Sequence, residues 1–184
     1  MNTTPDSSGT DTQRRASPHG PLHWRQIVDW LREDGVISQA VAERTVERCS
    51  RAESSQHPLV RLASVSMERA SDGKLLDLDL LTETIAPRCG LPFLRIDPLK
   101  VDAGRVADAM SASYAERHKV LPVLVSGDEV VVATAEPFIA DWVGEIERQT
   151  KRRVRRVLSN PVAIARYTAE FYALAKSVRA ALKS

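Results

Sequence analysis

The stretch that most constrains this chain is VLPVLVSGDEVVVATAEP, residues 120–137, in which two apolar runs flank Ser126-Gly127-Asp128. β-Branched residues such as valine favour half-buried strands, and the Gly-Asp pair supplies the backbone freedom that a tight turn needs. We therefore predict a β-hairpin here, with the chain after Cys89 arranged around it. No group of potentially catalytic side chains lies on this stretch or next to it.

The composition excludes several classes of protein. The 184 residues are 43% hydrophobic, which is enough for one ordinary domain or two small ones, and the formal net charge is only +2. Such a charge gives no general affinity for nucleic acid or acidic membranes. Cys49 and Cys89 make neither a disulfide scaffold nor a paired-cysteine zinc motif, and no apolar run approaches the length of about 18 residues that a membrane helix needs. We expect a cytoplasmic protein without a metal site or direct membrane insertion.

The first half of the chain predicts helices. Residues 1–21, rich in Ser, Thr, Pro and Gly, are expected to form a disordered leader, and residues 22–89 a helical hairpin subdomain of two degenerate repeats. In the first repeat, apolar residues at helical spacing begin at Trp24, Gly35 ends the helix, and Ser38 caps the next one. The second repeat is predicted to have a helix near 59–70, a turn at Asp72-Gly73, and a helix that is capped by Asp77 or Asp79 and ends near Cys89.

Residues 90–174 are predicted to form a small α/β domain. Two prolines between residues 90 and 102 favour extended backbone, and Asp102 can cap a helix over 103–117. The hairpin follows that helix. Apolar spacing after Pro137, at Ile139, Trp142, Val143 and Ile146, then predicts a helix that covers the sheet.

The end of the chain completes this domain. Residues 153–158 are a predicted third strand, and Asn160-Pro161 is a strong start signal for a final helix. Residues 175–184 are expected to continue it as a tail, a linker or a coiled-coil-like arm. The predicted fold class is α+β: helical hairpins followed by a small α/β domain with a three-stranded, mainly antiparallel sheet packed by helices.

No motif for catalysis is present. The phosphate-binding signature G-x-x-x-x-G-K-[ST] is absent, since Gly73-Lys74 is followed by Leu75 and lacks the earlier glycine. Neither G-x-S-x-G nor H-E-x-x-H occurs, and the four histidines are scattered. We therefore predict that the chain is not an enzyme and carries no cofactor.

Three residues are candidates for binding a partner. Arg152 and Arg155 belong to the basic run 151–156, which could attract an acidic or phosphate-rich partner; solvated charges on an exposed strand are the favoured alternative. Trp30 lies off the apolar stripe of its helix, whereas Trp24 lies on it. Trp30 is therefore the better candidate for an interface residue.

Residues 24–50 also allow a helix-turn-helix DNA reader to be considered, because two short helices flank a glycine-containing turn. The second helix, however, carries Glu43 and Glu47 beside Arg44 and Arg48. Near-neutral charge on this helix argues against binding in a DNA groove, so we predict no nucleic-acid partner.

From Cys89 to about Leu174 the chain resembles the N-terminal domain of type II secretion and type IV pilus assembly ATPases. Several sequence blocks occur in the order found in that family, with Glu136-Pro137 where Asp-Pro or Asn-Pro is usual. The other blocks that carry the resemblance are Gly90-Leu91-Pro92-Phe93, Ile96-Asp97-Pro98-Leu99, Arg117-His118-Lys119-Val120-Leu121-Pro122, Val130-Val131-Val132-Ala133 and Ser159-Asn160-Pro161.

This resemblance implies a non-catalytic docking or regulatory module that binds the platform or motor protein of a secretion or pilus machine. It also implies a cytoplasmic location, with recruitment to the inner membrane through that partner. The ATPase motor with its nucleotide site is not in this sequence, so the chain is either a fragment or a free-standing relative.

Some relatives bind cyclic di-GMP through tandem R-L-G-x-x-[LV]-V-x-x-G motifs, which is the alternative function. The second copy here reads Arg61-Leu62-Ala63 with Ala70 at the closing glycine, and the first has Gln26 in place of the arginine. Arginine suits a bidentate phosphate contact, whereas an added Cβ hinders close approach. Arg61 and Leu62 are the cofactor-binding candidates under this alternative, and the incomplete motif argues against tight binding.

Overall fold

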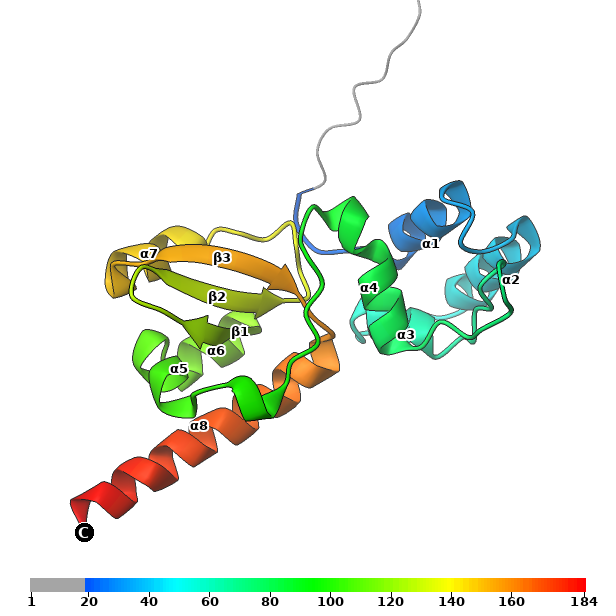
Figure 1. Cartoon of the computed structure of the whole chain (residues 1–184). Coiled ribbons are helices and arrows are strands. Elements are labelled where there is room, and N and C mark those ends of the chain that lie inside the picture. The colour runs from blue at the N-terminus through cyan, green and yellow to red at the C-terminus, as the bar shows by residue number, and fades with distance from the viewer. Residues whose placement is uncertain (1–18) are drawn as a thin grey trace, which may run out of the picture.

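The computed structural model describes residues 19–184, in which a helical part precedes an α/β part (Figure 1). Residues 1–18 of the expected leader lie outside the described residues. We use "helical part" for residues 22–89 and "α/β part" for residues 90–184. The helical part contains α1 (Trp24–Glu33), α2 (Gln39–Ser50), α3 (Pro58–Ala63) and α4 (Leu78–Cys89).

Side-chain caps explain where these helices begin. Ser38 Oγ accepts a hydrogen bond from a backbone N–H in the first turn of α2 at 3.1 Å, and Asp77 Oδ1 does the same for α4 at 2.8 Å. Gly35, just past the end of α1, has a φ of +69°, a conformation that glycine adopts without steric cost. The predicted first hairpin is confirmed, and the cap of α4 is Asp77 rather than Asp79.

Helix α3 is shorter than the predicted helix over 59–70. It ends at Ala63, and Ser66 has a φ of +55°, which a right-handed helix cannot contain. The chain then forms a tight turn in which Arg69 donates two hydrogen bonds to Asp72, at 2.9 and 2.6 Å. The Asp-Gly pair therefore closes a turn between short extended segments, and it does not end a helix.

The α/β part contains a short 3-10 helix and four α-helices around three strands. The predicted helix over 103–117 is two helices, because Met110 is extended, with a φ of −151°, and Ser111 Oγ caps a new helix by accepting from the Tyr114 N–H at 3.2 Å. The elements are η1 (Pro98–Lys100), α5 (Ala103–Ala109), α6 (Ala112–His118), β1 (Val120–Val125), β2 (Glu129–Thr134), α7 (Val143–Thr150), β3 (Arg153–Leu158) and α8 (Pro161–Lys183).

The helix after Pro137 begins later than the apolar spacing predicts. Trp142 is the residue before α7 and is only 2% exposed. Its indole N–H donates to the carbonyl of Ile139 at 3.2 Å, so the two residues belong to a turn that leads into the helix. The apolar residues of this segment are buried as predicted, but only part of the segment is helical.

The three strands form one sheet in the order β1-β2-β3. The predicted hairpin is confirmed, because β1 and β2 are antiparallel neighbours. β3 pairs with β2 in parallel, since the crossover through α7 returns the chain to the same end of the sheet. The α+β fold class is therefore confirmed, and the sheet is mixed rather than mainly antiparallel.

Both faces of the sheet are covered by helices. Val106 of α5 and Phe171 of α8 pack on one face against strand residues such as Val131. Tyr114 of α6 and Ile146 of α7 belong to the cluster on the other face. A third cluster fills the helical part. Burial on both faces explains why β1 and β2 are almost continuously apolar, whereas β3, at an edge of the sheet, exposes Arg153 and Arg155.

The helical and α/β parts share contacts around the end of β3. Leu158 is fully buried and belongs to the core of the helical part, although it is a strand residue. Glu136, after β2, accepts a hydrogen bond from the N–H of Leu22 at 2.8 Å and lies 2.9 Å from His57 Nε2. The two parts are therefore joined by both apolar and polar contacts.

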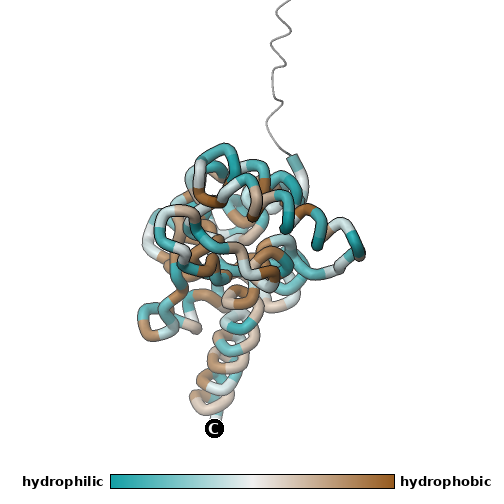
Figure 2. Tube along the Cα trace, turned by 90° about the vertical axis from the view of Figure 1, so that its right-hand side faces the viewer, coloured by the Kyte–Doolittle hydropathy of each residue, from teal (hydrophilic) through white to brown (hydrophobic). Residues whose placement is uncertain are grey.

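Helix α8 extends beyond the sheet towards the C-terminus, as two perpendicular views show (Figures 1 and 2). Its first half packs on the sheet through Ile164 and Phe171. Further along, Leu174, Val178 and Leu182 are 54%, 50% and 81% exposed. Within the described residues, α8 and every other helix are too short or too polar to cross a membrane.

Candidate functional site

Arg61, the arginine of the incomplete second motif, lies on α3 beside the end of α2. Its Nη2 donates hydrogen bonds to the backbone carbonyls of Cys49 and Ala52. A cation at a helix C-terminus stabilises the carbonyl groups that have no partner there. Arg61 therefore has a structural role in this conformation.

Arg61 also lies over the indole ring of Trp24, with Cζ 5.5 Å from the ring centroid. Arg25 approaches the same ring at 4.7 Å, and the imidazole of His23 stacks on it at 5.6 Å. Among the described residues, Nε and Nη1 of Arg61 have no hydrogen-bond acceptor. Part of the guanidinium fork thus remains for an anionic ligand next to an aromatic ring.

The other positions of the two motif copies offer less to a ligand. Leu62 is 0% exposed in the helical core, so it supports α3 rather than presenting a contact surface. In the first copy Gln26 occupies the arginine position, and the next residue, Ile27, is also 0% exposed. Ala70 donates its N–H to the carbonyl of Val36 at 2.8 Å, so the closing position of the second copy lies beside the residue that follows Gly35, the closing glycine of the first copy.

Trp30 is half-buried on α1 and packs edge-on against Phe138, with 6.2 Å between the ring centroids. Phe138 follows β2, so this aromatic pair joins the helical part to the α/β part. The predicted partner anchor therefore makes an internal contact with part of its ring.

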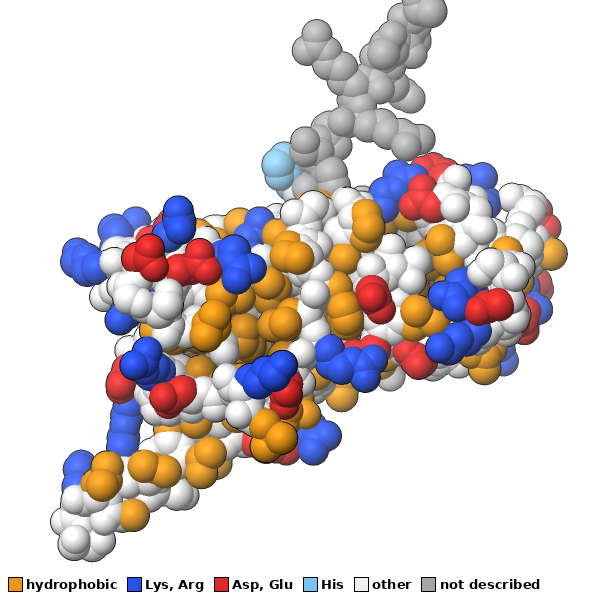
Figure 3. Space-filling model, viewed as in Figure 1, with side chains coloured by type: hydrophobic (Ala, Val, Ile, Leu, Met, Phe, Trp, Pro, Cys, Tyr) orange, Lys and Arg blue, Asp and Glu red, His pale blue; other side chains and the backbone are white. Residues whose placement is uncertain are grey.

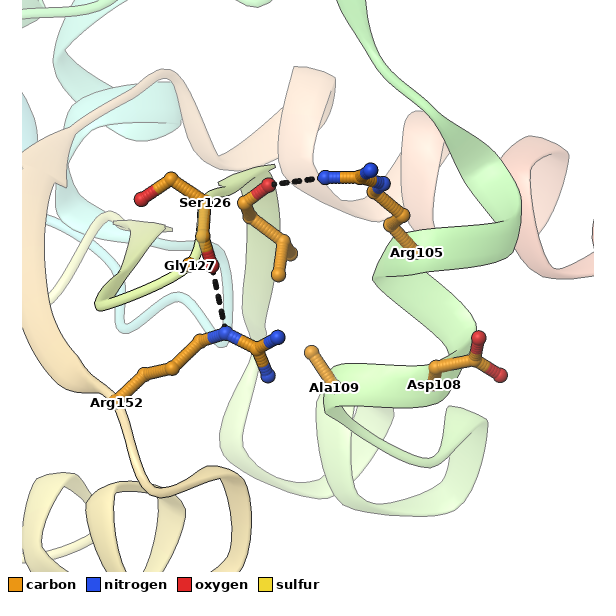
Figure 4. A pocket seen from close by; sticks show the side chains of 7 residues that line it. Arg105, Asp108, Ala109, Ser126, Gly127 and Arg152 are labelled. Atoms are coloured by element: carbon orange, nitrogen blue, oxygen red, sulfur yellow. Dashed lines mark hydrogen bonds between the residues drawn. The ribbon is translucent and has the colours of Figure 1, made fainter.

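Arg152 lines a cavity of about 400 Å³ together with Arg105 (Figure 4). The walls come from α5, the β1–β2 turn and the turn that precedes β3. Arg152 Nε donates to the carbonyl of Ser126 at 2.6 Å, and Arg105 Nη1 donates to the carbonyl of Val125 at 3.2 Å. These bonds hold two guanidinium groups from different elements against the same turn.

Two carboxylates lie near this cavity, one paired with an arginine outside it and one beside Arg105. Asp108 lines the cavity, but its carboxylate points away from the space between the arginines and pairs with Arg179 of α8 (Figure 4). Asp102 lies 3.8 Å from Nε of Arg105 and also caps α5 by accepting from the backbone N–H of Arg105 at 3.1 Å. The cavity thus presents cationic groups more than anionic ones.

Arg155 is exposed on β3 and lies 3.0 Å from Glu129, whose carboxylate Arg153 also approaches at 3.5 Å. On the face drawn in Figure 3, basic and acidic side chains lie next to one another. Trp30 is not brought near these arginines, since α1 and the start of β3 lie at opposite ends of the molecule (Figure 1). The three predicted partner-binding residues therefore form no single site.

Neither a metal site nor a reactive thiol is found between residues 19 and 184. No group of three or more His, Cys, Asp or Glu side chains in that range could hold a metal ion. Burial raises the pKa of the Cys89 thiol to about 12, and burial also raises the pKa of Cys49. A thiol with a raised pKa stays protonated at neutral pH and is a poor nucleophile.

Sequence similarity relates the α/β part to a known domain family. The model of the MshEN domain family matches residues 89–178. Residues 89–178 therefore resemble an MshEN domain. The type IV pilus assembly ATPase TfpB of Acinetobacter baylyi is 30% identical to this chain over 164 residues, which are 87% of this chain and 28% of TfpB. The chain thus spans a little over a quarter of the length of that curated relative.

Two solved structures share the fold. The structure of MshE with cdg, cyclic di-GMP, superposes with a TM-score of 0.57 at 18% identity, over 79% of this chain and 98% of the other. The N-terminal domain of XpsE superposes with a TM-score of 0.50 at 16% identity, over 83% and 99%. Both alignments are longer than the MshEN domain, so they include helical residues that precede it. The chain resembles the N-terminal domains of secretion and pilus ATPases, rather than their motor domain.

Proposed function

We propose that this chain is a non-catalytic docking and regulatory module of a type II secretion or type IV pilus assembly machine. The observation that carries the proposal is the similarity of 87% of the chain to a pilus assembly ATPase. The module acts through protein–protein contacts with the platform or motor protein of the machine. In this proposal residues 22–89 and 90–174 are two domains, and residues 175–184 are a tail.

The proposal places the protein in the cytoplasm, at the inner membrane when a partner recruits it. Arg155 at the exposed start of β3 and the exposed part of Trp30 on α1 are the residues we propose for partner contact. They lie on different surfaces, so each is tested separately.

A pull-down with the purified full chain tests the docking role. The chain is expected to retain the cytoplasmic domain of the platform protein, or the motor, from the same machine. Arg155→Glu should weaken capture about tenfold, because a charge reversal at an interface also introduces repulsion. Arg166→Glu, an exposed arginine on α8, is the matched control. Absence of any association with machine components contradicts the docking role.

An ATPase assay tests the proposal that the chain is not catalytic. The purified chain is expected to show no ATP turnover above a buffer control, because the sequence lacks the glycine-rich loop that cradles nucleotide phosphates. Measurable turnover that copurifies with the chain would overturn this part of the proposal.

Cyclic di-GMP binding is the second candidate function. It is supported by the fold shared with MshE and by the unpaired Nε and Nη1 of Arg61 beside Trp24. The buried Leu62 and the missing first arginine at Gln26 weigh against tight binding.

Titration calorimetry with cyclic di-GMP decides between the two candidates. Binding that Arg61→Ala abolishes supports the receptor function. Because this variant also loses contacts to α2, Arg61→Lys serves as a second variant that keeps the charge near the carbonyls but lacks the planar fork. No heat of binding to the wild-type chain removes this candidate.

A further inference from the structure

We propose that the cavity lined by Arg105 and Arg152 binds a phosphate group, either the free ion or the phosphate of a small metabolite. The site lies in the α/β part, away from Arg61 and from the motif positions of the helical part. It does not depend on the docking role or on cyclic di-GMP binding.

Both arginines keep hydrogen-bond donors for a ligand. Arg152 donates from Nε to Ser126 and from Nη1 to Thr150, at 2.6 and 3.4 Å, and its Nη2 has no acceptor among the described residues. Arg105 donates from Nη1 to Val125, and its Nη2 is likewise without an acceptor there. In Figure 4 the terminal nitrogens of Arg152 point into the space between the turn and Ala109.

The geometry favours a phosphate over a cation or a neutral ligand. Two guanidinium groups approach from α5 and from the turn before β3, and each offers a planar arrangement of donors that matches phosphate oxygens. Bonds to backbone carbonyls already hold both side chains, so binding requires little further ordering. The volume of about 400 Å³ is within the range of small-molecule sites and leaves room for an organic group attached to the phosphate.

The nearby acidic groups do not occupy this space. Asp108 pairs with Arg179. Asp102 caps α5 and lies 3.8 Å from Nε of Arg105, so Nη2 of that arginine has no carboxylate partner among the described residues. Asp128 in the β1–β2 turn is within 3.5 Å of the hydroxyl of Ser126 and does not line the cavity. A phosphate therefore enters without displacing a carboxylate from the terminal nitrogens of Arg152.

Calorimetric titration of the full chain at low ionic strength tests the site, with inorganic phosphate and glycerol 3-phosphate as the two ligands. We expect both to bind, and we expect Arg105→Gln and Arg152→Gln each to weaken binding about 10- to 100-fold, the effect of losing hydrogen bonds to a charged group. The side chain of Arg105 is 65% exposed, so its replacement leaves the core unchanged. The matched control is Arg155→Gln, which removes an exposed arginine outside the cavity.

Each result has a defined meaning. Tighter binding of glycerol 3-phosphate identifies a phosphorylated metabolite as the ligand class, and equal binding identifies the phosphate group alone; both support the site. The proposal is overturned if neither ligand binds at millimolar concentration, if Arg105→Gln and Arg152→Gln bind like the wild type, or if Arg155→Gln weakens binding as much as they do. None of these failures affects the docking proposal, which is measured with a protein partner.

Discussion

The helical part and the α/β part use arginine side chains in different ways. In the helical part Arg61 bonds the end of α2, and Arg88 of α4 bonds Asp34 just after α1, at 2.6 and 3.0 Å. In the α/β part Arg105 and Arg152 hold a turn with some of their donors and keep the others beside a cavity. Positive charge alone therefore does not mark a binding site. A binding site needs hydrogen-bond donors without a partner and open space in front of them.

The two parts also differ in how their cores are built. The α/β part has one apolar cluster on each face of its sheet, whereas the helical part has a single cluster that includes Leu158 from β3. The helical core is thus completed by a residue of the other part. Five substitutions test this difference between the two parts.

Leu158→Ala should have the largest effect, because it leaves a cavity in a core that both parts share. We expect a loss of about 2–5 kcal/mol in the free energy of unfolding, measured by chemical denaturation. Hydrogen exchange should accelerate in α1 and in β1 together. The control is Leu124→Ala, since Leu124 is 53% exposed on β1. Faster exchange confined to one part would show that the cores are independent.

Arg61→Ala is expected to lower the free energy of unfolding by about 1–2 kcal/mol, because α2 loses hydrogen bonds from a charged group. Arg105→Gln should change it by less than about 0.5 kcal/mol, as is usual for exposed positions. Denaturation curves of the two variants measure the difference. Equal losses would show that Arg105 contributes as much to the free energy of unfolding as Arg61 does, and would remove this difference between the two parts.

Tyr172→Phe tests a buried polar contact in the α/β part. Burial raises the pKa of Tyr172 from 10.0 to about 12, and its hydroxyl donates to the carbonyl of Met110 at 2.8 Å. Because the folded-state pKa is raised, the contribution is complete below pH 10 and is lost as the pH rises through 12. The variant should be about 1 kcal/mol less stable at neutral pH and lose less stability above pH 10 in thermal unfolding. An unchanged alkaline profile contradicts this assignment.

Asp72→Asn should have the smallest effect. Hydrogen bonds from Arg69 and from the backbone of Lys74 lower the pKa of Asp72 from 3.8 to about 2. Since the folded-state pKa is depressed, the contribution is present above pH 3.8 and disappears as the pH falls through 2. Melting temperatures of wild type and variant should differ slightly at pH 7, converge as the pH falls below 2, and differ less in about 1 M salt, because the pair is exposed. A difference in melting temperature that persists below pH 2 would show that the substitution acts on the conformation of the turn rather than on the charge of the carboxylate.

Local signals in the sequence predicted much of the fold. Ser38 and Asn160 have side chains that cap backbone N–H groups a few residues away, so their effect can be recognised without knowledge of the tertiary structure. The break at Met110 was missed because apolar residues continue at helical spacing across it, and the cap at Ser111 was the available signal. The direction of β3 was missed although the intervening helix α7 indicates a crossover.

The candidate site was predictable only in part. Arg61, Arg152 and Trp30 each stand out locally, by motif, by charge or by helical phase. Arg105 does not, because its cavity forms only when α5 packs beside a turn that follows it in the chain. The contact between Trp30 and Phe138 depends on tertiary packing in the same way.

The connection from β3 into α8 has a mechanical consequence. Leu158 is fixed in the helical core, and two residues later Asn160 bonds Asp79 of α4 at 3.2 Å and caps α8. The 23 residues of α8 form a rod about 35 Å long. Because Ile164 and Phe171 pack α8 on the sheet, the rod turns together with the α/β part, and a turn of about 5° at its base moves its far end by about 3 Å, given a rise of about 1.5 Å per residue. Any reorientation of the helical part relative to the α/β part would therefore be amplified at the C-terminal end of α8.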